Sequence, residues 1–163
     1  MIIMGVDPGI ATCGYGFIEI NGNRQRCLAS GILKTSSQET PVNRLNLIYT
    51  GINKLIKEFN PQTVGIENLF FSKNTKTAFQ VGQAKGVIML ACSHNELEVY
   101  EYTPLQVKLG VCGYGSATKT QVKSMVAKIL QLEEIPSSND AADALAVCLC
   151  HGQSHKMRLK TYS

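Results

Sequence analysis

The sequence predicts an α/β fold: a mixed five-stranded sheet with its first three strands antiparallel and with helices on both faces. Two observations lead to this prediction. The first 36 residues contain three strand-like segments separated by turn residues, with no helical pattern between them. The rest of the chain alternates helical and strand-like segments, which is typical of sheets covered by helices. The length of 163 residues and the hydrophobic content of 44% suit one globular domain.

The strands are bounded by turn residues. The first is the apolar run 1–6, which the turn Asp7-Pro8-Gly9 closes. The second, 12–20, ends at the hairpin turn Asn21-Gly22-Asn23. The remaining strands are expected at 24–34, 63–67 and 97–102.

The helices are predicted from apolar periodicity and from their end signals. The first follows the third strand and stops at Asn60-Pro61. A short helix begins at Thr103-Pro104, and a loop with three glycines, 110–116, follows it. The other helices are expected at 77–95, at 118–132, and from a cap within 136–139 to about His151.

Residues 1–151 are predicted to form the single domain, and 152–163 a basic, flexible C-terminal tail.

Four acidic residues lie on hydrophobic elements. Only three aspartates occur in the chain: Asp7 ends the first strand, and Asp140 and Asp143 lie in the apolar last helix. Glu67 ends the fourth strand. An unpaired ionised carboxylate in such surroundings is costly or becomes protonated. Asp140 and Asp143 share a helical face, and Asp7 and Glu67 share a sheet edge if their strands are neighbours. We therefore expect the four acids to form a cation site.

A site of carboxylate oxygens favours two Mg²⁺ ions, with Mn²⁺ as a possible substitute. Nucleases use such a pair, in which one ion activates water and the other stabilises the leaving oxygen. The alternative is local: Asp140 caps its helix and Asp7 belongs to its turn. That alternative leaves Glu67 and Asp143 unexplained.

Basic and aromatic residues near the acids are candidates for DNA contacts. The net charge of +4 is mild and says little by itself. An aromatic ring beside a nuclease site can stack on an unpaired base. The alternatives are a solvated surface for the lysines and a core contact for one of the two rings. The candidates are Phe70, Phe71, Lys73, Lys76, Lys108, Lys119 and Lys123.

The helix at 77–95 has small residues at four-residue spacing: Ala78, Gly82 and Gly86. Each internal glycine costs roughly 1 kcal/mol relative to alanine, so a close backbone contact is expected in return. The contact partner is either the sheet of the same chain or the same helix of a second subunit, and we expect the second, so that Ala78, Gly82 and Gly86 form a dimer interface.

The six cysteines show no regular framework and are expected to be reduced thiols. The alternative is a metal site formed by Cys148, His151 and His155, which share a helical face. The sequence shows no signal peptide and no apolar run long enough for a membrane span, so the expected compartment is the cytoplasm.

The order of elements is that of the ribonuclease H-like fold. Five motifs follow one another along the chain: Gly5-Val6-Asp7-Pro8-Gly9, Ile66-Glu67 followed by Phe70, Gly82-Gln83-Ala84-Lys85-Gly86, Gln106-Val107-Lys108 and Asp140-Ala141-Ala142-Asp143-Ala144-Leu145. With these motifs, in this order and at this spacing, residues 1–151 resemble the RuvC family of bacterial Holliday-junction resolvases.

This resemblance implies that Asp7, Glu67, Asp140 and Asp143 are the metal-binding catalytic acids. It also implies a homodimer that binds a four-way DNA junction in recombination and repair, together with the branch-migration proteins RuvA and RuvB. The expected products are paired nicks with 5′-phosphate and 3′-hydroxyl ends. Lys119 is expected to offset charge at the scissile phosphate, and Lys108 to contact a phosphate.

Three alternatives remain at this point. An ATPase lobe of the same fold needs a second lobe, and the segment 110–120 lacks the spacing of a P-loop. A non-catalytic junction- or RNA-binding module has no use for four acids beside its phosphate-binding surface. A nuclease of the same fold that acts on RNA or RNA–DNA hybrids is opposed only by the match along the whole chain.

Overall fold

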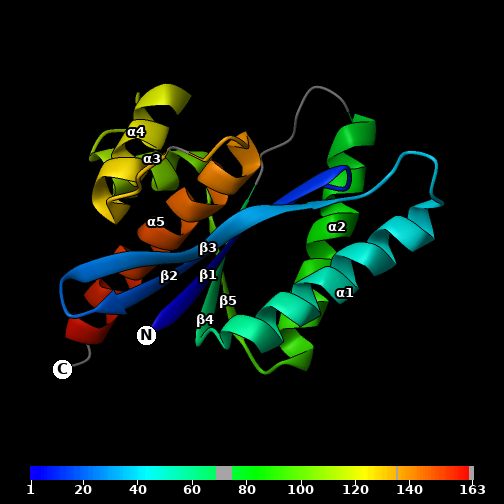
Figure 1. Cartoon of the computed structure of the whole chain (residues 1–163), viewed down its shortest axis with the longest axis horizontal. Helices are drawn as coiled ribbons and strands as arrows, with labels where there is room; N and C mark the ends of the chain where they lie inside the picture. Colours follow the sequence, from blue (N-terminus) through cyan, green and yellow to red (C-terminus); the bar gives the residue numbers. More distant parts are fainter. Residues whose placement is uncertain (69–74, 135, 162–163) are drawn as a thin grey trace.

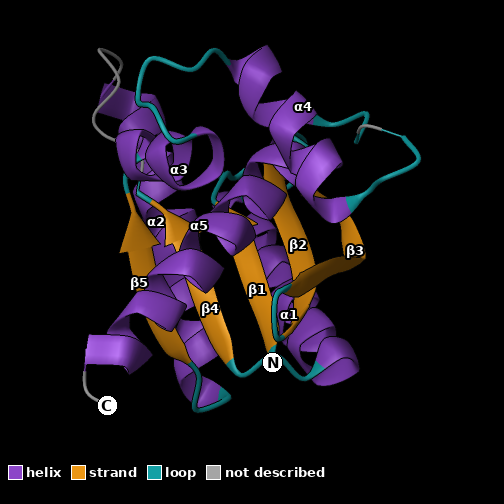
Figure 2. Ribbon diagram, turned by 90° about the vertical axis from the view of Figure 1, so that its left-hand side faces the viewer, coloured by secondary structure: helices purple, strands orange, loops and turns teal. Residues whose placement is uncertain are grey.

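The sheet is mixed and five-stranded, as predicted. The computed structural model describes residues 1–68, 75–134 and 136–161, and the side chains of all of these except residues 75, 76 and 156–161. The strand order is β3-β2-β1-β4-β5 (Figure 2). The strands are β1 (Ile2–Asp7), β2 (Thr12–Asn21), β3 (Arg24–Lys34), β4 (Thr63–Glu67) and β5 (Glu98–Tyr102). The strands β1, β2 and β3 pair antiparallel, whereas β1, β4 and β5 pair in parallel.

Helices cover both faces of this sheet (Figure 1). They are α1 (Pro41–Phe59), α2 (Thr75–His94), α3 (Pro104–Cys112), α4 (Lys119–Leu130) and α5 (Asn139–Thr161). One buried core joins the sheet to α1 and α2, and it contains Phe17, Ile52 and Ile88. The other core joins the sheet to α3, α4 and α5, and it contains Ile18 and Leu145. The sheet is therefore the middle layer of three.

Glycines allow α5 to lie directly on the sheet. Gly16, Gly5 and Gly65 are aligned across β2, β1 and β4. A Cβ atom on Gly5 would lie 2.2 Å from the carbonyl oxygen of Ala144 in α5. A Cβ on Gly16 or on Gly65 would likewise meet side chains of α5 at 2.8 Å and 3.0 Å. This row of glycines removes the side-chain layer that normally separates a helix from a sheet.

Two helix starts are capped by threonines, of which Thr103 was predicted as a cap and Thr118 as a helix start. Thr103 caps α3 and Thr118 caps α4, each in a capping box with the glutamine three residues later. The hydroxyl of each threonine accepts a hydrogen bond from that glutamine's backbone N–H at 3.2 Å.

Three helix boundaries differ from the prediction. Helix α2 begins at Thr75, and α3 continues to Cys112, so 110–112 are helical and do not belong to a loop. Helix α5 continues to Thr161, so most of the predicted flexible tail is helical and the predicted end at His151 is wrong. A glycine commonly ends a helix, but a Cβ on Gly152 would lie 2.5 Å from the Ile20 side chain. Gly152 therefore serves a close contact with β2, and the helix continues past it.

The cysteines are free thiols, as predicted. The alternative metal site is wrong: the His151 ring nitrogens are hydrogen-bonded to Tyr102 at 2.7 Å and to Thr63 at 2.9 Å. The Cys148 thiol donates to the carbonyl oxygen of Gly16 at 3.3 Å. Within the described part of the chain, no helix has both the length and the apolar character for crossing a membrane.

Candidate active site

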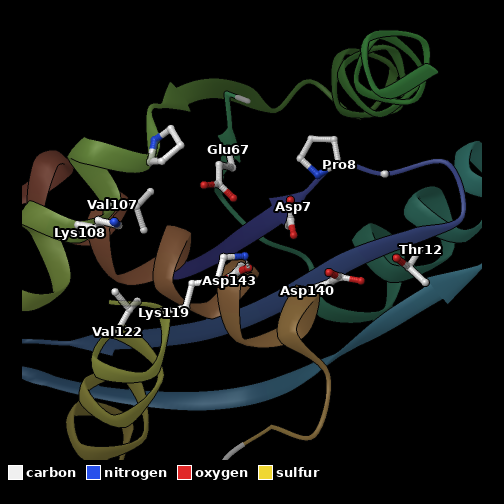
Figure 3. A pocket seen from close by; sticks show the side chains of 12 residues that line it. Asp7, Pro8, Thr12, Glu67, Val107, Lys108, Lys119, Val122, Asp140 and Asp143 are labelled. Atoms are coloured by element: carbon white, nitrogen blue, oxygen red, sulfur yellow. Dashed lines mark hydrogen bonds and ion pairs between the residues drawn. The ribbon is translucent and has the colours of Figure 1, made fainter. Parts of the chain in front are cut away.

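An open cleft of about 410 Å³ lies at the edge of the sheet where β1 and β4 end (Figure 3). All four acids singled out in the sequence line this cleft, and so do two of the predicted DNA-contacting lysines. The lining residues are Asp7, Pro8, Gly9, Thr12, Glu67, Pro104, Val107, Lys108, Lys119, Val122, Asp140 and Asp143. The cleft therefore gathers residues from five separate segments of the chain.

The sheet places Asp7 and Glu67 side by side. Strands β1 and β4 are parallel neighbours with Val6 opposite Ile66, so the two acids are the next residues at the same edge. Side chains alternate between the faces of a strand, and Gly5 and Gly65 both face α5. Asp7 and Glu67, two residues further on, therefore face α5 as well.

The first turns of α5 supply Asp140 and Asp143. These residues are three apart on the helix and so point the same way. A Cβ on Gly14 would lie 2.0 Å from the carbonyl oxygen of Asp140, so the helix start is in direct contact with β2. Gly14 pairs with Asp7 across the strands. The same close packing of α5 on the sheet thus sets the distance between the two pairs of acids.

Burial and the neighbouring acids raise the pKa of Asp7 and of Glu67. Burial is the largest cause for Asp7, followed by the charges of Glu67, Asp143 and Asp140, and together they raise the pKa of Asp7 from 3.8 to about 8. Burial and then the charge of Asp143 raise the pKa of Glu67 from 4.5 to about 7. Without a bound cation, ionisation of Asp7 and Glu67 in this cleft is unfavourable, so the cleft favours binding of a cation.

Lys119 partly offsets this negative charge. Its ammonium group lies 3.4 Å from Asp143 Oδ2 (Figure 3). It lowers the pKa of both Asp7 and Glu67, while Asp143 in turn raises the pKa of Lys119. One ammonium group faces four acids, so the compensation is incomplete.

Three helices begin beside the cleft. Pro104 and Lys119 are the first residues of α3 and α4, Asp140 is the second residue of α5, and all three line the cleft. The N-terminal end of a helix has a partial positive charge and free N–H groups, which favour phosphate. Carboxylates and helix N-termini together suit a ligand that combines cations with phosphate groups.

The acids surround the cleft without converging on one point. Among the described residues, no group of three or more His, Cys, Asp or Glu residues could hold a metal ion as the side chains lie. The oxygen donors suit Mg²⁺, which commonly binds one or two carboxylates and takes its other ligands from water and phosphate. The chemistry of the donors therefore fits a magnesium site that needs further ligands from outside the chain.

The other predicted contacts fall into three groups. Lys123 lies beside the cleft and donates to Asn139 Oδ1 at the start of α5. Phe70, Phe71 and Lys73 lie outside the described residues, as does the side chain of Lys76 in α2. The predicted interface residues of α2 (Ala78, Gly82 and Gly86) are not among the residues that line the cleft.

The sequence prediction missed six residues that line the cleft: Pro8, Gly9, Thr12, Pro104, Val107 and Val122. Pro8 and Gly9 lie in the family motif that contains Asp7, and their position next to an acid is a usable signal. Thr12 begins the next strand, and its polar side chain at that point is a second signal. Val107 lies in the family motif Gln106-Val107-Lys108, whereas Val122 has no sequence signal, because only the packing of α4 brings it to the cleft.

The strand order and the acidic cleft at the ends of two parallel strands define a ribonuclease H-like protein. The family model described as crossover junction endodeoxyribonuclease RuvC matches residues 3–151. A RuvC protein of Natranaerobius thermophilus is 61% identical over 160 residues, which cover 98% of this chain and 99% of that protein. The chain therefore belongs to the RuvC family of crossover junction endodeoxyribonucleases.

Solved structures of this family have the same fold. The structure of Thermus thermophilus RuvC is similar with a TM-score of 0.90 and 36% identity, covering 96% of each chain. T. thermophilus RuvC in complex with a Holliday junction substrate has a TM-score of 0.92 and 35% identity, again covering 96% of each chain. The similarity extends over the whole described fold, including the elements around the cleft.

Proposed function

We propose that this protein is an endodeoxyribonuclease that resolves four-way (Holliday) DNA junctions. The observation that supports this most strongly is the cleft, in which four acids from β1, β4 and α5 meet lysines from α3 and α4. Relatives that carry the name crossover junction endodeoxyribonuclease match almost the full chain. A related protein is known in complex with a Holliday junction substrate.

The proposed cofactor is Mg²⁺, two ions per site, with Mn²⁺ as a substitute. Asp7, Glu67, Asp140 and Asp143 are the residues that would hold the ions. When bound, the ions would activate water and stabilise the leaving oxygen of the phosphodiester. Binding would also lower the raised pKa values of Asp7 and Glu67, so that both acids become ionised ligands.

The remaining groups of the cleft act on the DNA. Lys119, the first residue of α4, is suited to offset negative charge that develops on the scissile phosphate. Lys108, on α3, is suited to hold a phosphate of the same strand. Val107 and Val122 line the cleft without polar groups, and such walls strengthen electrostatic interactions by excluding water.

A second copy of the chain is the proposed partner, and α2 is the proposed interface. Phe79, Leu90 and Met89 on α2 are 69%, 50% and 37% exposed. Gly82 and Gly86 lie on the same side of the helix, and no described atom outside their own helix lies within 4 Å of a Cβ placed on either. The close contact expected from these glycines is therefore absent within the described chain, which leaves them available to a second subunit. A symmetric dimer would also match the two-fold symmetry of a four-way junction.

A dimer of this kind would place one cleft at each of two strands of like polarity. We propose symmetric nicks that leave 5′-phosphate and 3′-hydroxyl ends, in concert with the branch-migration proteins RuvA and RuvB. Because the substrate is chromosomal DNA, the cytoplasm is the proposed compartment.

A cleavage assay on a synthetic four-way junction tests the proposal. With Mg²⁺, the protein should cut the junction in pairs of nicks and leave linear duplex DNA and RNA–DNA hybrid largely intact. Asp7→Asn should reduce cutting by about 10³-fold or more, because one of the carboxylates that would hold the ions is lost together with its charge. Junction binding by Asp7→Asn should be unchanged or stronger, since the variant has one negative charge fewer.

Two results would contradict the proposal. One is equal cutting of linear duplex, and the other is full activity of Asp7→Asn. Glu19→Gln is a matched control, because Glu19 is a surface acid paired with Arg26 and does not line the cleft. Its activity should equal that of the unchanged protein.

A further inference from the structure

Lys85, on α2, forms a polar bridge to the end of the strand that supplies Glu67. Its ammonium group donates to Glu101 Oε2 at 2.6 Å and to Asn68 Oδ1 at 3.1 Å. The Lys85 side chain is 18% exposed, whereas that of Arg26 in the surface pair with Glu19 is 72% exposed. A long side chain that is held by two partners and largely covered is an ordered part of the fold.

Asn68 is the residue through which this bridge reaches the cleft. It directly follows Glu67, and its backbone N–H donates to the carbonyl oxygen of Tyr102 at 2.7 Å, which extends the pairing with β5. Ile66 packs in the core that contains α1 and α2, and Glu67 lines the cleft on the α5 face. By the alternation of an extended chain, Asn68 points back toward α2, where Lys85 binds it.

The bridge holds both strands at the place where their pairing ends. Glu101 lies opposite Ile66 in the register of β4 and β5, and Glu67 lies opposite Tyr102 as the last pair. Few ladder hydrogen bonds oppose twisting at such an end. Lys85 binds one residue on each strand, both on the α2 face, and so resists rotation of the end of β4.

We propose that Lys85 is a positioning residue for Glu67. By holding Asn68 and Glu101 on one face of the sheet, it keeps the Glu67 carboxylate on the other face, directed into the cleft. The proposal rests on the proposed function, in which Glu67 holds a catalytic cation. The bridge also links the cleft to α2, the helix proposed for contact with a second subunit.

The rival role for Lys85 is a direct contact with a DNA phosphate. That role predicts weaker junction binding and a salt dependence reduced by about one counterion. A positioning role predicts unchanged binding and a lower kcat, because a small displacement of one metal-binding group slows the chemical step.

The first test compares Lys85→Met with Lys85→Arg in junction cleavage and in junction binding without metal. Lys85→Met should lower kcat by about tenfold or more, with the Kd for the junction within about twofold of the unchanged protein. Lys85→Arg keeps the charge and two donors, so it should restore most of the rate. Arg26→Met is the matched control, because it removes a cation from a surface ion pair outside the cleft.

The second test needs no metal and no cleavage. In protein labelled with ¹³C at the glutamate carboxyl carbons, Glu67→Gln identifies the signal of Glu67. Lys85→Met should shift or broaden this signal, and Lys85→Arg and Arg26→Met should leave it in place. If the unchanged protein fails to cut junctions, the proposed function fails, but this spectrum still decides whether Lys85 orders Glu67.

The third test asks whether Lys85 acts through Asn68. In an Asn68→Ala background, Lys85→Met should add little to the loss of kcat, because the hydrogen bond from Lys85 to Asn68 is already lost. Glu101→Gln weakens the same bridge from β5 and should give a milder loss, which keeps the test usable if Lys85→Met folds poorly. Additive losses, a weaker junction Kd, or an unmoved Glu67 signal in Lys85→Met would each overturn the proposal.

Discussion

The two faces of the sheet are built in different ways, and β1 shows both. Met4 and Val6 point toward α1 and α2 and are completely buried among large apolar side chains. Gly5 and Asp7 point toward α5, where the glycine brings the helix against the strand and the acid lines the cleft. Along β1, side chains fill the α1–α2 face, whereas on the α5 face Ile3 is buried in the core and Gly5 lets the helix backbone contact the strand.

This difference separates stability from function within one strand. Apolar burial is stabilising, whereas burial and the neighbouring acids raise the pKa of Asp7 and of Glu67, so that ionisation of these two acids opposes folding. The charged cleft can persist because the apolar cores on both faces of the sheet stabilise the fold. Substitutions on the two faces should therefore differ in how they affect stability and cleavage.

The largest effect is expected from Gly5→Ala on the α5 face. The added Cβ would lie 2.2 Å from a backbone oxygen of α5, so the helix must move. We expect a loss of more than about 3 kcal/mol in the free energy of unfolding, and a large loss of cleavage in the protein that remains folded. Urea unfolding measures the loss of stability, and junction cleavage measures the loss of activity. Unchanged stability would show that α5 does not lie against the glycine row.

Ile52→Ala on the opposite face should lower the stability of the protein without lowering its cleavage rate. Ile52 is completely buried in α1, so its truncation should cost about 3 kcal/mol of unfolding free energy. Below the unfolding transition, kcat should remain close to that of the unchanged protein, because none of the residues that line the cleft belongs to this core. A kcat that falls as far as in Gly5→Ala would remove the distinction between the faces.

The pH dependence of stability should report the acids of the cleft. The folded-state pKa of Asp7 is raised from 3.8 to about 8, and that of Glu67 from 4.5 to about 7. Between these values the folded state binds more protons than the unfolded state, so stability is greatest below about pH 4 for these groups and falls as pH rises toward 8. We expect a decrease of several kcal/mol without divalent cations, because each unit of difference in pKa between the folded and unfolded states corresponds to about 1.4 kcal/mol.

Thermal unfolding at several pH values measures this decrease. Mg²⁺ should raise the Tm more at pH 8 than at pH 5, because it binds the ionised acids of the folded state. Asp7→Asn should flatten the profile. A profile that is equally steep in Asp7→Asn would mean that Asp7 does not cause the pH dependence.

The smallest effect is expected from Gly82→Ala on α2. A Cβ on Gly82 meets no described atom outside its helix within 4 Å, in contrast to Gly5. At low protein concentration, the substitution should raise the unfolding free energy by about 1 kcal/mol through helix propensity. Sedimentation should show weaker dimerisation. An unchanged dimerisation affinity would mean that the interface does not include Gly82 of α2.

The pattern of residues was sufficient to predict the sheet. Turn residues around apolar runs located all five strands within one or two residues, because local turn chemistry and alternation determine where strands begin and end. The end of α5 was predicted wrongly, since Gly152 contacts β2 and that contact has no signature in the local sequence. The four acids were predicted as one site because carboxylates on apolar elements are costly unless they serve a ligand.

The sequence alone determined which residues are expensive to bury and which elements contain them, because those costs depend on local chemistry. The tertiary structure decided how the acids are spaced and which apolar and polar residues line the cleft beside them, namely Val107, Val122 and Thr12. It also decided that Lys85 binds the end of the strand next to Glu67. These features depend on contacts between segments that are distant in the chain, and such contacts arise only when α5 settles on the glycine row and α2 packs on the other side.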